Sequence, residues 1–88
     1  MQIRLEKPTR EQLDKLGVTE WSIWESAPST FDWYYDDKET CYILEGKVTV
    51  KTDTGEVYFE KGDLLTFPAG LSCVWIVHEK VRKHYKFG

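Results

Sequence analysis

The chain has 88 residues, a formal net charge of −3 and a high aromatic content that includes four Trp residues. A chain of this length forms one domain, which buries only about 60% of the surface that its unfolded form exposes. The acidic balance argues against nucleic acid as the main partner, and no signal-peptide pattern or apolar run of ~20 residues is seen. We therefore expect a cytoplasmic, single-domain protein that binds neither nucleic acid nor a membrane.

A short helix is predicted in the sequence TREQLDKLG, at residues 9–17. Thr9 and Gln12 have the spacing of a capping box, and Gly17 provides a stop. Leu13 and Leu16 give the helix one apolar edge. A helix of about two turns is stable only when it packs on a larger structure.

From Trp21 onward the sequence changes to short β-type runs that are separated by turn residues. The expected strands are WSIW, TFDWYY, ETCYILE, KVTVKT, EVYFE, DLLTF, SCVWIV and VRKHYKF. A tight hairpin is expected at Gly46, and His78 is expected to lie in a turn. We predict an all-β sandwich or barrel over residues 20–88, preceded by a strand and helix segment over residues 1–19.

Two stretches have the residue spacing of a known family. They are Glu39 and Gly46, with six residues between them, and the set Gly62, Pro68, Gly70 and Cys73. Together with the phrases ETCYILEGKV, GDLLTFPAGLSC and KHYKF, they make roughly residues 20–87 resemble the small RmlC-like cupins grouped with (S)-ureidoglycine aminohydrolase-like proteins. The resemblance implies a jelly-roll β-barrel with one short N-terminal helix, and a homodimer.

The resemblance also implies a metal site of three His and one Glu, from which this chain departs. The corresponding positions hold Trp33, Tyr35, Glu39 and Cys73. A shift of one residue would place Asp32 and Tyr34 at the first two positions, but alternation along a strand favours Trp33 and Tyr35. Trp has no lone pair and neutral Tyr is a weak ligand, so we expect no cofactor. The alternative is a divalent transition metal held by Glu39 and Cys73.

Alternation directs six side chains to the inside of the implied barrel: Trp33, Tyr35, Glu39, Cys41, Cys73 and Trp75. Aromatic walls suit a planar or apolar small molecule, so Trp33, Tyr35 and Trp75 are candidate ligand-binding residues, together with Cys41. Glu39 and Cys73 are the candidate catalytic residues. A carboxylate among aromatic rings can act as an acid or base, and a thiol can assist where its thiolate is favoured.

The two cysteines, Cys41 and Cys73, form no CxxC motif and no disulfide framework. We expect two reduced thiols. For Cys41, next to the apolar run YIL, the simplest interpretation is a small packed residue.

The C-terminal run VRKHYKF leaves two registers open. One directs Val81, Lys83, Tyr85 and Phe87 inward and makes Lys83 a ligand-binding residue and partner of Glu39. The other directs His84 inward. The first set is more apolar, so we expect it to face the core and His84 to lie on the surface.

The sequence favours a binding module that holds a small metabolite in a metal-free pocket. The alternative is an enzyme on a small nitrogenous or carbonyl compound, with Glu39 as acid or base, Cys73 assisting and a metal ion as an optional requirement. A third hypothesis is a dimerisation domain that uses the strand at residues 21–24 and the N-terminal segment as an added edge strand. The sequence leaves open whether any reaction is catalysed.

Overall fold

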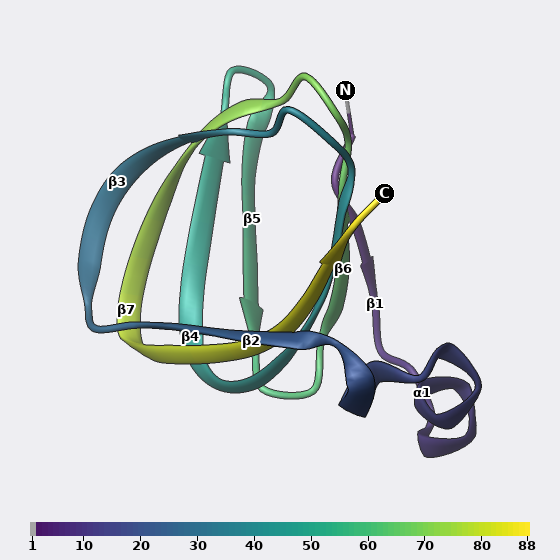
Figure 1. Cartoon of the computed structure of the whole chain (residues 1–88). Coiled ribbons are helices and arrows are strands. Elements are labelled where there is room, and N and C mark those ends of the chain that lie inside the picture. The colour runs from purple at the N-terminus through teal and green to yellow at the C-terminus, as the bar shows by residue number, and fades with distance from the viewer. Residues whose placement is uncertain (1) are drawn as a thin grey trace.

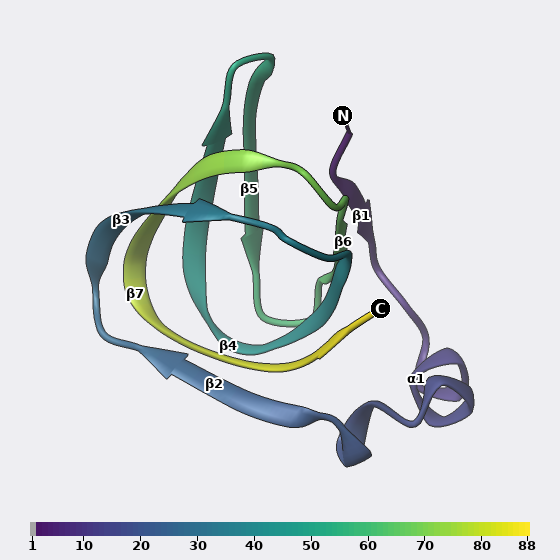
Figure 2. The same ribbon diagram turned by 45° about the horizontal axis from the view of Figure 1, so that its top comes forward.

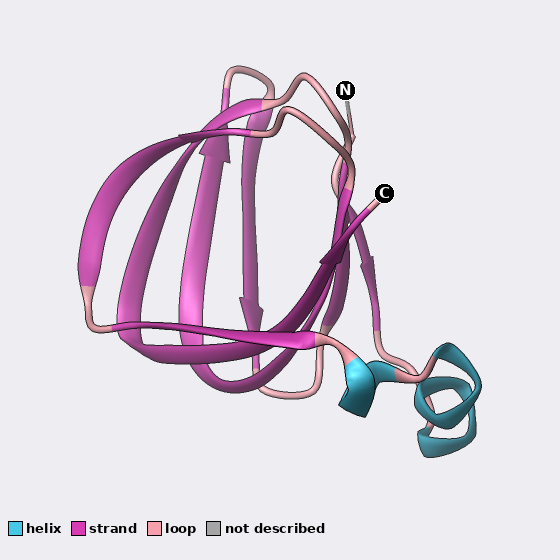
Figure 3. Cartoon of the chain, viewed as in Figure 1, coloured by secondary structure: helices cyan, strands magenta, loops and turns pink. Residues whose placement is uncertain are grey.

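A computed structural model describes residues 2–88, over which the fold is mostly β with one α-helix (Figures 1 and 3). The elements in chain order are β1 (Arg4–Glu6), α1 (Arg10–Leu16), the 3₁₀ turn η1 (Val18–Glu20), β2 (Ser22–Ser26), β3 (Ser29–Tyr34), β4 (Glu39–Thr52), β5 (Gly55–Glu60), β6 (Leu64–Phe67) and β7 (Ser72–Phe87). The predicted β-rich class and the single short helix are confirmed.

The strands form one antiparallel sheet in the order β1-β6-β4-β7-β2, with β3 added on β7 and β5 added on β4. The two long strands, β4 and β7, change partners along their length: β7 pairs with β3 in its first half and with β2 in its second half. The sheet therefore curves around a common interior, which Figure 2 shows. Among the described residues β1 and β2 end the sheet and do not pair with each other, so the closed barrel that the resemblance implies is not seen.

Two turns predicted from the sequence are absent between residues 39 and 87, where the long strands continue instead. Gly46 lies inside β4 with φ 110°, next to register shifts between Ile43 and Val48. An added Cβ on Gly46 would lie 2.5 Å from the carbonyl oxygen of Lys80 in β7. The hairpin prediction was wrong because a glycine at a strand bend gives the same sequence signal as one in a tight turn. His78 likewise lies within β7.

The helix α1 has the predicted ends. The side chain of Thr9 accepts from the backbone of Gln12, the Gln12 side chain accepts from the backbone of Thr9, and Gly17 ends the helix with φ 69°. No residue of α1 is buried, and Figure 1 shows the helix beside the sheet, beyond the end of β1. Its leucine edge therefore packs less than predicted. No helix within residues 2–88 is long and apolar enough to span a membrane.

The core lies inside the curve of the sheet and is built from apolar side chains of the long strands and β5, among them Val48, Val50, Phe59 and Trp75. At one end of this core two charged residues are buried: Glu39, at the start of β4, and Lys83, in the second half of β7. Charges are expensive to bury unless they are partnered. The place where they meet is the candidate functional site.

Candidate functional site

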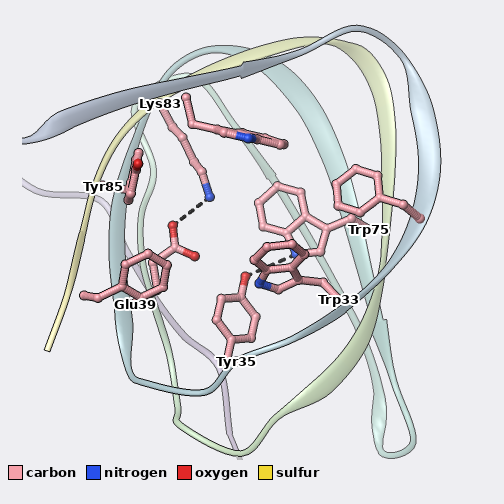
Figure 4. Close-up of a pocket in the computed structure, with 9 residues that line it drawn as sticks. Trp33, Tyr35, Glu39, Trp75, Lys83 and Tyr85 are labelled. Carbon is pink, nitrogen blue, oxygen red and sulfur yellow. Dashed lines mark hydrogen bonds and ion pairs between the residues drawn. The ribbon is translucent and has the colours of Figure 1, made fainter.

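A pocket of about 130 Å³ opens beside the two buried charges (Figure 4). It is lined by residues of β2, β3, β4, β7 and the loop after β3: Trp24, Phe31, Trp33, Tyr35, Glu39, Trp75, Lys83, Tyr85 and Phe87. Aromatic rings make up most of the wall. The polar side chains of the wall are few and converge from different strands, which is the usual composition of a small-molecule site.

Glu39 and Lys83 form a buried ion pair at the pocket. Lys83 Nζ donates to Glu39 Oε2 at 2.7 Å, and the two side chains are 7% and 3% exposed. Figure 4 shows the second carboxylate oxygen of Glu39 directed into the open centre of the pocket. Because each charge has lost most of its hydration, the pair is held by the mutual attraction of the two groups and by their neighbours.

The ammonium group of Lys83 lies among aromatic rings. Its Nζ is 4.5 Å from the ring centroid of Trp75, 4.9 Å from that of Trp24 and 5.9 Å from that of Tyr85. These cation–π contacts and the ion pair with Glu39 hold the ammonium group in place. The site thus contains a fixed positive and a fixed negative charge with a net charge of zero.

Tyr35 forms part of the pocket wall and is held firmly. Its backbone donates to the carbonyl of Leu71 at 2.9 Å and accepts from Gly70 at 2.6 Å, and its ring stacks on Phe67 at 4.8 Å. Trp75 Nε1 donates to the Tyr35 hydroxyl at 3.2 Å. Burial, followed by the negative charge of Glu39, raises the pKa of Tyr35, so the hydroxyl keeps its proton and can donate it.

Two exposed aromatic residues belong to the pocket wall. Trp33 is 47% exposed and Phe87 is 50% exposed, although both line the pocket. Trp33 also lies edge-on to the Tyr35 ring, with ring centroids 6.3 Å apart. These two residues lie at the boundary between the pocket and solvent, where a bound molecule would cover them.

The two cysteines are not among the residues that line the pocket within the described chain. Cys41 is fully buried in the core, and Cys73 lines a more open hollow that shares Trp33 with the pocket. Burial raises the pKa of Cys41 to about 12. Burial and then the charge of Glu39 raise the pKa of Cys73 to about 11. Both thiols are therefore protonated at neutral pH, which makes them weak nucleophiles.

The raised thiol pKa values predict a loss of stability at alkaline pH. In the unfolded chain a Cys ionises near pH ~8.5, whereas in the fold Cys73 and Cys41 keep their protons up to about 11 and about 12. The unfolded state then binds fewer protons than the fold, so the free energy of unfolding falls as pH rises through this range. Urea denaturation at about pH 8 and about pH 10 measures the fall. The fall should be shallower in the Cys41→Ala/Cys73→Ala variant, and an equal fall in both proteins would contradict the prediction.

The structure adds four lining residues that the sequence did not assign to the site: Trp24, Phe31, Tyr85 and Phe87. Tyr85 and Phe87 alternate with Lys83 along β7, and the sequence directed both inward with Lys83 without assigning them to the site. Trp24 reaches the pocket only through the pairing of β2 with β7, opposite Lys83. No sequence signal specifies that pairing.

His84 was expected on the surface and is in fact buried. It lies on the other face of β7 from Lys83, and its Nδ1 is 3.1 Å from the carbonyl oxygen of Trp21. The segment before β2 covers it, so alternation gave the correct facing of His84 but not its burial. Asp32 and Tyr34, the alternative positions of the first motif, are exposed and line the more open hollow.

Residues 13–85 match the family model of the EutQ-like cupin domain. The chain belongs to this family. Its structure is similar to that of a DUF861 family protein from Thermotoga maritima, with 58% sequence identity, a TM-score of 0.96, and coverage of 99% of this chain and 100% of that one. A search of the curated proteins found no match.

Two further solved structures share the cupin fold with this chain. The EutQ protein of Clostridium difficile is 26% identical, with a TM-score of 0.69 over 74% of this chain and 52% of that one. A DUF861 family protein of unknown function from Pseudomonas syringae is 25% identical, with a TM-score of 0.68 over 75% of this chain and 29% of that one. The present cupin thus spans about half of the C. difficile protein and less than a third of the P. syringae protein.

The residues at the metal-ligand positions of this cupin do not fit a metal ion. Trp33 has no lone pair, a neutral Tyr is a weak ligand, and Glu39 Oε2 is already paired with the Lys83 ammonium group. Glu39 is the one residue of the implied metal-ligand set that this chain keeps. The group beside it is the positively charged Lys83 ammonium.

Proposed function

We propose that this cupin binds a small, planar, uncharged metabolite in the aromatic pocket, without a metal ion. The observation that carries the proposal is the buried Glu39–Lys83 pair, whose polar groups border a cavity instead of being enclosed by packed side chains. A buried ion pair is weak evidence for stability, because apolar residues of similar volume often stabilise a core equally well. Its place at a cavity wall is therefore better explained by ligand binding.

The aromatic walls specify the shape of the proposed ligand. Phe31 and Trp75 stack with their rings 14° from parallel, and Tyr35 and Phe67 stack within 7° of parallel. Flat rings on several sides of a narrow cavity favour a flat molecule that stacks on them. Trp33, at the exposed side, would cover such a molecule and exclude water from the ion pair.

Binding can be tested by tryptophan fluorescence and thermal unfolding with a set of uncharged planar fragments. We expect saturable quenching and a stabilisation of about 2.7 kcal/mol at a ligand concentration of 100 times Kd. The Trp33→Ala variant, which removes an exposed residue from the wall, should fold and bind more weakly. A second variant, Tyr58→Ala, removes an exposed aromatic residue outside the pocket and should bind normally. Equal weakening by both substitutions would contradict the proposed site.

An enzyme acting on a small nitrogenous or carbonyl compound is the second candidate, by analogy with the ureidoglycine aminohydrolase-like cupins that the sequence resembles. The observation in its favour is the Glu39 carboxylate, which is directed into the pocket beside a proton-carrying ammonium group and so could accept or return a proton. Cys73 keeps its thiol proton and lies outside the lining, so we assign it no nucleophilic role in this candidate. Turnover that is lost in Glu39→Gln while binding persists would support the enzyme.

We also propose that the protein acts as a homodimer in the cytoplasm. β1 and β2 end the sheet, and they carry the exposed apolar residues Leu5 and Ile23. Free strand edges of this kind pair readily with a second chain. The two free thiols are compatible with a reducing compartment. Light scattering should give twice the mass of one chain, and the mass of a single chain would refute the dimer.

A further inference from the structure

We propose that the ligand of the pocket is a cyclic amide or a primary carboxamide, a molecule whose N–H and C=O groups lie side by side on one edge. This inference rests on the proposed function and names the chemistry of the ligand. It follows from three properties of the site: the hydrogen-bonding groups left over by the ion pair, the net charge, and the size and shape of the cavity.

The ion pair leaves N–H donors on Lys83 and one acceptor on Glu39 for a ligand. Lys83 has three N–H donors, of which one is used in the 2.7 Å hydrogen bond to Glu39 Oε2. Over residues 2–88 the other carboxylate oxygen, Oε1, has no side-chain partner, and Figure 4 shows it directed into the pocket. A ligand C=O can therefore accept from Lys83 while a neighbouring N–H donates to Glu39 Oε1.

The charge of the site selects against ionic ligands. A cation would meet the Lys83 ammonium group, which already occupies the faces of Trp24 and Trp75. An anion would meet the Glu39 carboxylate and the electron-rich ring faces. A neutral group with a donor beside an acceptor is repelled by neither, and it satisfies both buried charges.

The cavity suits a small ring. Its volume of about 130 Å³ is slightly less than the ~150 Å³ of an engineered cavity that binds benzene, so a ring of about five or six atoms fits. Amides are planar, and an open-chain secondary amide is trans, with its N–H and C=O on opposite edges. A lactam ring enforces the cis arrangement that presents both groups to the same edge, and a primary carboxamide has an N–H on that edge as well.

The proposal can be tested on the wild-type protein with ring compounds of equal size. Pyrrolidinone, a lactam, carries the adjacent N–H and C=O, whereas butyrolactone and cyclopentanone keep the ring and the C=O but replace the N–H by an oxygen or a methylene. Titration followed by NMR of the tryptophan indole groups should show pyrrolidinone binding about tenfold or more tightly than either analogue. The reason is that neither butyrolactone nor cyclopentanone can donate a hydrogen bond to the charged Glu39 carboxylate, so Glu39 Oε1 is left unpaired. N-methylacetamide, the trans secondary amide, should bind more weakly than acetamide.

The outcomes separate this inference from the proposed function. Equal affinity for the three rings would overturn the amide inference and leave the pocket a binding site for flat neutral molecules. Binding of none of these compounds, nor of any fragment, would overturn both. The Glu39→Gln variant should lose the preference for the lactam while still binding cyclopentanone, and a retained preference would contradict the role of Oε1. If this variant does not fold, the comparison of analogues in the wild-type protein decides alone.

Discussion

The Lys83→Met variant is expected to be less stable than the wild type by about 3–5 kcal/mol. Methionine retains most of the side-chain volume but removes the charge, so the Glu39 carboxylate, 3% exposed, loses its partner. The three aromatic rings around Nζ lose their cation–π contacts as well. The free energy of unfolding from urea denaturation measures the loss.

Two controls make this prediction specific to the buried pair. Lys80→Met changes an exposed lysine of the same strand and should alter stability by no more than about 0.5 kcal/mol. Removing both charges, in Glu39→Leu/Lys83→Met, should cost less than removing Lys83 alone, because no unpaired charge remains. If the single and double variants lost equal stability, the two charges would not be coupled as the structure requires.

Replacing Gly46 with alanine is the second change with a large expected effect. The residue has φ 110°, and an added Cβ would lie 2.5 Å from the Lys80 carbonyl oxygen and 2.6 Å from the Cα of Val81. Both contacts are with backbone, so β4 and β7 would have to separate at the point where they bend. We expect a loss of about 3 kcal/mol or more in the free energy of unfolding.

Gly62→Ala is the matched control for this substitution. Gly62 has a similar φ of 94°, but an added Cβ would meet nothing within 4 Å. It should therefore show only the cost of the backbone conformation, about 1–3 kcal/mol. The difference between the two variants measures the close approach of β4 and β7, and similar losses would mean that the strands do not approach so closely.

The sequence predicted the fold class because its turn residues, helix cap and cupin spacings are local signals. It did not predict that β4 continues through Gly46, since a glycine that permits close strand approach and one that permits a turn look the same in one sequence. The sequence named the N-terminal segment and residues 21–24 as edge strands, but the closed barrel that the resemblance implies is not seen. Which strands pair at an edge depends on contacts far apart in the chain, such as those of β1 with β6.

Within the site, alternation directed Lys83 toward Glu39 because both positions are fixed by strand periodicity. Alternation also put Cys73 on the buried face, but it could not show that Cys73 lines a different hollow from Glu39. The position of Trp33, half in solvent near the end of β3, was likewise beyond a pattern that divides residues only into two faces.

The most direct test of the account is to map where a bound molecule contacts the protein, by NMR of the wild-type chain with an uncharged planar fragment. We expect the indole N–H signals of Trp33, Trp24 and Trp75 to shift together and to saturate, while that of Trp21, which does not line the pocket, stays unchanged. Saturable shifts confined to other parts of the molecule would contradict the claim that the Glu39–Lys83 pair marks the binding site.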